Sequence, residues 1–150
     1  MTPAAIEPAP GEPYGRTLLT ADDDHETLIM RWRPGATCAP HDHGDAGGAI
    51  HLLEGAFVER RYRHDADGLS LVAVYEHEAP AVVAVEPGCI HDMRSLGPGT
   101  SVHRYSPRIA GMRVYDVERR ETLVVSDDCG AWVPRDEALI VAREPWPEPP

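Results

Sequence analysis

The chain has 150 residues, of which 42% are hydrophobic and 26% charged, and this size and composition suit one globular domain with a single core. Its formal net charge is −11, so it repels phosphate backbones and anionic lipid, and we expect no nucleic acid or membrane partner. Three cysteines form no C-x-x-C pair and residues 1–13 do not resemble a secretion signal, which together favour a reducing, cytoplasmic location.

Short strands are predicted along most of the chain. Proline-rich segments at 1–13 and 144–150 are expected to lie extended or disordered outside one domain spanning 14–143. Runs of β-branched, aromatic or alternating apolar residues predict strands within 27–32, 49–53, 57–62, 69–75, 81–85, 102–105, 113–115 and 122–125. No long helical periodicity appears between residues 16 and 134, and any helix is expected to be short and to lie near the N-terminus or around 136–141. We therefore expect an all-β sandwich or barrel with little helix.

Two histidines, His41 and His43, are separated by one residue, so on a strand their side chains share a face. A third, His91, follows the Pro87-Gly88 turn at the start of another predicted strand. Three imidazoles of this kind can hold one metal ion at about 2.0–2.2 Å. The H-x-H pair taken alone is equally compatible with two solvated side chains.

The spacing of glycines around these histidines resembles the two sequence motifs of cupins. Gly35, the two histidines of the H-x-H pair, Gly48 and Gly55 match the first motif, with Gly48 where most cupins carry a glutamate ligand. Gly88 and His91 are similar to the core of the second motif. A centre with three neutral imidazoles and no carboxylate ligand keeps the full charge of a divalent ion and favours anionic ligands such as a thiolate.

Ser101, His103 and Tyr105 alternate along one face of a predicted strand. Such a polar face either lies in solvent or lines a cavity where its members hydrogen-bond to one another. Because the opposite face offers Val102 beside Arg104, solvent exposure explains the strand poorly. We expect a Ser–His–Tyr chain that presents the Tyr105 hydroxyl to the metal as a catalytic group.

The motifs H-D-H, L-L-E-G, S-x-H-x-Y-S-P and G-M-R-V-Y, with an upstream Y-x-R-x-L, together resemble the cysteine dioxygenase family within the cupins, over residues 14–115. The resemblance implies a single antiparallel, jelly-roll-like β-barrel and one Fe(II) per chain, held by His41, His43 and His91. It implies oxidation of the cysteine sulfur by O2 to the sulfinate. It places four residues around the substrate: Arg16 as a carboxylate clamp, with Tyr14, Trp32 and Met112 nearby.

Other readings remain open from the sequence. The substrate could be another small thiol such as 3-mercaptopropionate, although relatives that prefer it commonly carry glutamine where this chain has Arg16. A non-enzymatic metal-binding sensor and a zinc hydrolase also fit three histidines. Gly48 stands where mammalian relatives have a cysteine crosslinked to the tyrosine, so Tyr105 is expected to be unmodified. We expect a monomer.

The remaining histidines and cysteines are assigned lesser roles. His25, His64 and His77 are expected in solvent, and His51 is not expected to face the metal. Cys38 and Cys89 lie near the ligands in sequence and are expected to be small apolar fillers, with thiolate ligation as the alternative.

Overall fold

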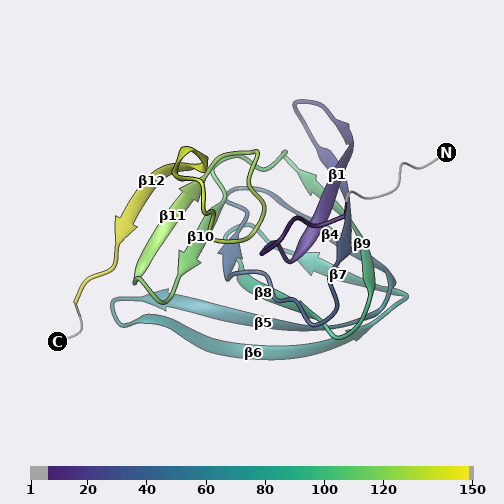
Figure 1. The fold of residues 1–150 in the computed structure, drawn as a ribbon, viewed down its shortest axis with the longest axis horizontal. Helices are drawn as coiled ribbons and strands as arrows, with labels where there is room; N and C mark the ends of the chain where they lie inside the picture. Colours follow the sequence, from purple (N-terminus) through teal and green to yellow (C-terminus); the bar gives the residue numbers. More distant parts are fainter. Residues whose placement is uncertain (1–6, 149–150) are drawn as a thin grey trace.

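The computed structural model describes residues 7–148 and contains strands with one short 3-10 helix (Figure 1). The strands are β1 (Tyr14–Ala21), β2 (Glu26–Trp32), β3 (His41–Asp42), β4 (Gly47–Glu54), β5 (Ala56–Asp65), β6 (Gly68–Glu78), β7 (Ala81–Val85), β8 (Ile90–Ser95), β9 (Gly99–Ser106), β10 (Arg113–Asp116), β11 (Glu121–Val125) and β12 (Ile140–Pro145). The 3-10 helix η1 covers Glu137–Leu139, inside the segment where a short helix was expected. None of the helical structure in residues 7–148 is long and apolar enough to cross a membrane.

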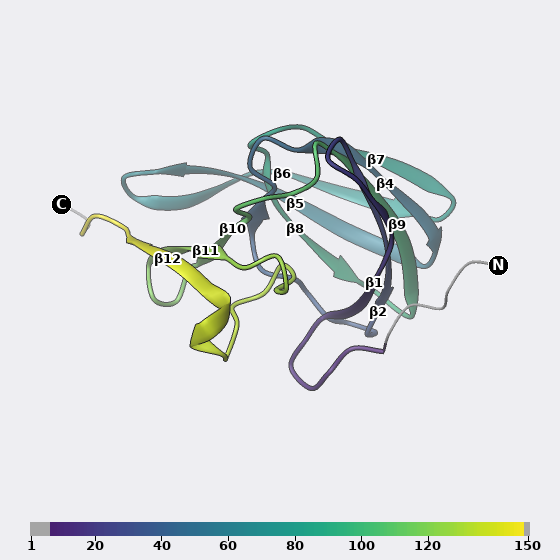
Figure 2. The ribbon, with the colours of Figure 1, turned by 90° about the horizontal axis from the view of Figure 1, so that it is seen from above.

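The strands form two antiparallel sheets. One sheet has the order β1-β2-β9-β4-β7 and the other the order β12-β11-β10-β3-β8-β5-β6. The long β5–β6 hairpin runs along the lower edge of Figure 1, and Figure 2 shows β10, β11 and β12 set apart from β1 and β2. The predicted all-β, jelly-roll-like fold is therefore confirmed. The two sheets each keep free edges and do not close into one hydrogen-bonded cylinder.

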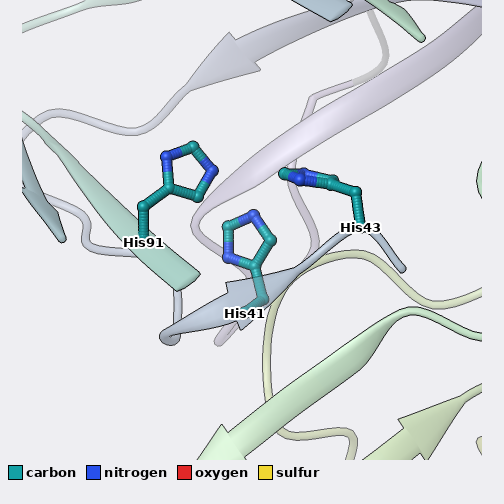
Figure 3. A group of neighbouring side chains, drawn as sticks. All are labelled: His41, His43 and His91. Carbon is teal, nitrogen blue, oxygen red and sulfur yellow. The ribbon is translucent and has the colours of Figure 1, made fainter. Parts of the chain in front are cut away.

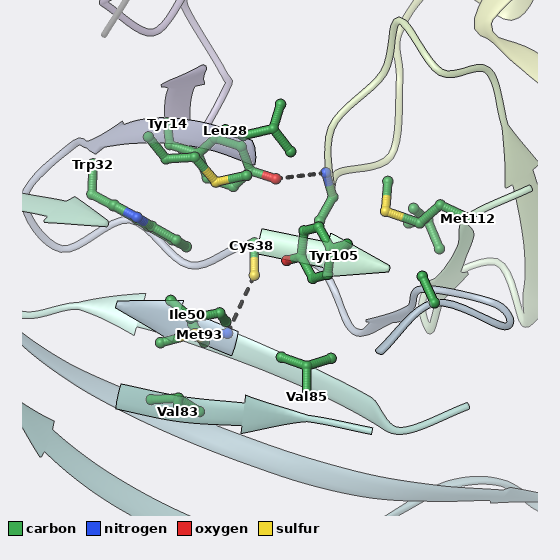
Figure 4. Close-up of a cluster of buried hydrophobic side chains, with 14 of the residues drawn as sticks. Tyr14, Leu28, Trp32, Cys38, Ile50, Val83, Val85, Met93, Tyr105 and Met112 are labelled. Carbon is green, nitrogen blue, oxygen red and sulfur yellow. Dashed lines mark hydrogen bonds between the residues drawn. The ribbon is translucent and has the colours of Figure 1, made fainter. Parts of the chain in front are cut away.

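The core lies between the sheets, because alternate residues of each strand point inward. Phe57, Ile50 and Leu52 are almost completely buried there, and each contributes about 1.5–3 kcal/mol by leaving water. Figure 4 shows that Trp32 and Tyr105 belong to the same cluster. The polar face of β9 thus points into the molecule, which decides against the solvent-exposed reading.

The boundary predicted at residue 144 is wrong. Strand β12 continues to Pro145 and pairs with β11, and Trp146 is buried with its Nε1 donating to Thr122 Oγ1 at 2.8 Å. An edge strand tolerates a proline because one of its two sides needs no N–H donor. Residues 7–13 form no strand, and the outermost parts of the predicted tails, 1–6 and 149–150, lie outside the described residues.

Candidate metal centre and substrate cavity

Three histidines from two neighbouring strands converge inside the fold (Figure 3). His41 on β3 is the register partner of His91 on β8, and His43 directly follows β3. Gly88, with φ of +74°, forms the turn that leads into β8. All three side chains are buried, and one nitrogen of each ring lies within 4.8 Å of the others. Small ring rotations bring such a set onto one ion.

Burial keeps the imidazoles of His41 and His43 neutral, as metal ligands must be. Burial, followed by repulsion from His91, lowers the pKa of His41 to about 3. Burial likewise holds the pKa of His43 well below its ordinary value. The Nδ1 atoms of His41 and His91 are both occupied, by Ala39 O at 2.8 Å and by Glu59 Oε2 at 2.7 Å, which leaves their Nε2 atoms for an ion.

The donor set fits a first-row transition metal, because imidazole suits iron, zinc, copper and nickel. No cysteine or carboxylate joins the three histidines in any candidate group within residues 7–148. The thiol of Cys38 instead accepts a hydrogen bond from Met93 N at 3.2 Å, and burial raises its pKa to about 12. Cys38 is therefore a neutral, buried side chain (Figure 4).

A cavity of about 320 Å³ opens above the histidines. Nine of the residues singled out from the sequence line it: Tyr14, Arg16, Trp32, His41, His43, His91, His103, Tyr105 and Met112. Ser101 lies behind them, hydrogen-bonded to His103. Glu26 and Arg108 also line the cavity, and sequence reasoning did not single them out.

Ser101, His103 and Tyr105 form the expected hydrogen-bonded chain. Ser101 Oγ lies 2.7 Å from His103 Nε2, and His103 Nδ1 lies 2.9 Å from the Tyr105 hydroxyl oxygen. Trp32 Nε1, which can only donate, donates to Ser101 Oγ at 2.9 Å.

These distances set the direction of the chain. Because Ser101 is fully buried, its own proton must find an acceptor, and His103 Nε2 is the one in reach. His103 Nδ1–H then donates to the Tyr105 oxygen, and burial keeps His103 neutral by lowering its pKa to about 3. Burial also raises the pKa of Tyr105 far above its ordinary value. The Tyr105 O–H is thus left free to donate into the cavity.

Tyr105 also contacts one of the three histidines directly. Its ring stacks on that of His43, with centroids 4.8 Å apart and an interplanar angle of 27°. Gly48 on β4 is the register partner of Tyr105, and a Cβ placed there would lie 1.8 Å from Arg104 O. Only glycine fits this position, so the crosslink of mammalian relatives has no counterpart in this chain.

A loop after β11 forms one wall of the cavity, and its role was not predicted. Arg16 Nη2 donates to Asp127 O at 2.8 Å, and Ala131 N donates to the Tyr14 hydroxyl at 2.9 Å. The loop 126–131 is therefore held against β1 by two residues expected to contact substrate. The sequence of this segment, Asp128-Cys129-Gly130, indicates a turn and gives no sign of a contact with β1.

The outer histidines differ in their surroundings. His64 is exposed, as expected, and His51 is exposed and does not line the cavity. His25 was expected in solvent and is half-buried beside Asp22. His77 is a correction: it is half-buried and its Nε2 lies 3.1 Å from Glu59 Oε1. Glu59 is fully buried and was missed, because a lone glutamate in an alternating strand is typical of a solvent-facing position.

Two antiparallel sheets around a buried cluster of three histidines define a metal-binding protein of the cupin fold. Solved structures share this fold. A protein with a double-stranded β-helix domain from Klebsiella pneumoniae subsp. pneumoniae has a TM-score of 0.59 and 21% identity, covering 73% of this chain and 84% of that one. An RmlC-like cupin from Shewanella frigidimarina has a TM-score of 0.55 and 18% identity, covering 69% and 84%. KdgF from Halomonas sp. has a TM-score of 0.54 and 16% identity, covering 64% and 80%.

The family is defined by sequence. A profile described as cysteine dioxygenase type I matches residues 10–119, and the chain belongs to this family. The family and the three-histidine site together indicate a metal-dependent cupin dioxygenase that acts on a small molecule with O2.

Proposed function

We propose that this protein is an iron-dependent thiol dioxygenase that converts L-cysteine and O2 to cysteine sulfinate. The observation that carries the proposal is the convergence of three buried histidines at a cavity that Arg16 and Tyr105 also line. His41, His43 and His91 would hold one ferrous ion per chain. When bound, such an ion supplies a site where a thiolate and dioxygen are brought together and activated.

Arg16 would bind the substrate carboxylate. Asp127 O occupies one of its N–H groups and fixes the side chain against the loop, while its remaining donors can form the paired hydrogen bonds that suit a carboxylate. The anchored guanidinium is pre-organised, so less side-chain entropy is lost when substrate binds.

Tyr105 would act on the substrate through its hydroxyl. Its raised pKa keeps it a proton donor, and the hydrogen bond from His103 Nδ1 fixes the direction in which that proton points. Tyr14, Trp32 and Met112 would shape the remaining wall and exclude water from the reacting atoms.

The test is an anaerobically iron-loaded protein mixed with cysteine or 3-mercaptopropionate and air, with oxygen uptake and sulfinate formation both measured. We expect stoichiometric sulfinate from cysteine and a higher kcat/KM than with 3-mercaptopropionate. The reverse preference would move the substrate to the other thiol. Iron binding without thiol-dependent oxygen uptake would indicate a sensor, and hydrolysis with bound zinc a hydrolase.

Location and assembly are part of the proposal. We propose a monomer in the cytoplasm, where the free thiols of Cys38, Cys89 and Cys129 remain reduced. Size-exclusion chromatography with light scattering at several protein concentrations tests the monomer.

A further inference from the structure

A buried carboxylate lies directly behind one of the three histidines. Glu59 on β5 has no exposed surface, and its Oε2 accepts a hydrogen bond from His91 Nδ1 at 2.7 Å. Its other oxygen faces two basic groups, His77 Nε2 at 3.1 Å and Arg61 Nη2 at 3.4 Å. The Arg61 guanidinium stays protonated, so its ion pair with Glu59 favours the charged form of the carboxyl group.

The three histidines are supported unequally by the protein. His41 Nδ1 lies 2.8 Å from the neutral carbonyl oxygen of Ala39, and His43 Nδ1 is buried with no hydrogen-bond partner among the described residues. His91 alone is backed by a carboxylate. An anionic acceptor behind an imidazole fixes its tautomer and raises its basicity as a ligand, which a carbonyl does less strongly.

Neighbouring strands hold Glu59 in place. Tyr75 on β6 stacks on His77 and lies under the Arg61 guanidinium, whose carbon is 4.9 Å from the ring centroid. Glu59 and Tyr75 are register partners, so the β5–β6 hairpin fixes both. None of Glu59, Arg61, His77 and Tyr75 lines the substrate cavity, so this cluster reaches the centre only through His91.

We propose that Glu59 is a positioning residue for the metal centre: its carboxylate directs His91 Nε2 toward the ion and places one negative charge behind that ligand. The proposal rests on the metal site of the proposed function. The sequence assigned no negative charge to the surroundings of the ion, whereas the structure places the Glu59 carboxylate one hydrogen bond behind His91. A negative charge near the ion stabilises the more highly charged oxidation state, so Glu59 lowers the reduction potential.

Glu59→Gln tests the charge, because the amide oxygen can still accept the hydrogen bond from His91. Fe(II) affinity is measured anaerobically by competition with a chromophoric chelator, and the Fe(III)/Fe(II) midpoint potential by spectroelectrochemistry. We expect affinity to fall by about 10- to 100-fold and the potential to rise.

Asp92→Asn is the matched control. Asp92 is a buried carboxylate next to His91 in sequence, but it accepts hydrogen bonds from Arg60 and Tyr62 instead. The same chemical change there is expected to leave Fe(II) affinity and potential close to the wild-type values. If Glu59→Gln does not fold, His77→Asn replaces it as the test variant. We expect it to lower the Fe(II) affinity by between about 2- and 10-fold, because it weakens one hydrogen bond to Glu59.

Wild-type affinity and potential in folded Glu59→Gln would overturn the proposal and reduce Glu59 to a packing role. A wild-type protein that fails to bind Fe(II) would overturn the metal centre and this inference with it. A third outcome separates the two proposals: the wild type binds Fe(II) but does not oxidise cysteine, while Glu59→Gln lowers the Fe(II) affinity and raises the potential. This outcome would refute the proposed function and leave the inference standing.

Discussion

Gly48→Ala should destabilise the fold and displace Tyr105. The added Cβ would lie 1.8 Å from Arg104 O and 3.1 Å from Tyr105 Cα, and real Cβ atoms essentially never approach closer than 3.0 Å. The difference, 3.0 − 1.8 = 1.2 Å, must be taken up by backbone, so β4 and β9 have to separate locally. Overpacking costs about 1–3 kcal/mol. Each weakened ladder hydrogen bond adds about 0.5–1.5 kcal/mol.

The expected total is about 3 kcal/mol, which for a chain of this length lowers Tm by about 6–12 °C. Urea unfolding and calorimetry measure the loss, and kcat for cysteine reports the displaced Tyr105. Gly97→Ala is the control, since a Cβ there meets nothing within 4 Å and its backbone is not left-handed. A Gly48→Ala protein as stable and active as Gly97→Ala would refute the close approach of β4 to β9. The same clash predicts that Gly48→Cys will not install a crosslink to Tyr105.

Three further outcomes follow from the cavity. Because burial lowers the pKa of His103 to about 3, the folded protein loses stability as pH falls from 6.5 toward 3, by about 1.4 kcal/mol per pH unit. In urea unfolding of the metal-free protein, His103→Gln should therefore lose less stability at acid pH than the wild type. Equal pH dependence of the unfolding free energy in the two proteins would contradict this. Trp32→Phe keeps the ring but removes the N–H donor to Ser101, so unfolding free energy should fall by about 1 kcal/mol and kcat should drop; no change in either would show that the donor is dispensable. Arg16→Ala should raise KM for cysteine by about 10- to 100-fold while iron content stays normal. The KM of Arg16→Lys should lie between those of the wild type and Arg16→Ala. An unchanged KM in Arg16→Ala would remove Arg16 from the site.

The sequence predicted strands where the local residue pattern is typical of a strand, and it missed β1, whose eight residues were not among the predicted segments. All eight predicted strand segments lie within observed strands, because each is marked locally by β-branched, aromatic or alternating apolar residues. Strand β3 has only two residues and β12 ends at a proline, so neither carries a recognisable pattern. Their pairing depends on neighbours far away in the chain, which local propensity does not report.

The site divides in the same way. The metal ligands could be predicted because they lie in short local motifs. The polar face of β9 could be predicted because its residues alternate along one short segment. Glu59 was not, because its importance depends on β5 lying beside β8 and on β6 carrying His77 to it. The loop 126–131 was missed for the same reason, since its contacts with Arg16 and Tyr14 join opposite ends of the chain.

Strand β3 has a mechanical consequence for the larger sheet. It joins β10, β11 and β12 to the rest of that sheet, and its register includes only two residue pairs with β10 and one with β8. His41 and His91 form the register pair between β3 and β8, so an ion bound to both would hold these two strands together. Chelation should therefore accelerate amide hydrogen exchange first in β10 to β12, while the β5–β6 hairpin stays protected.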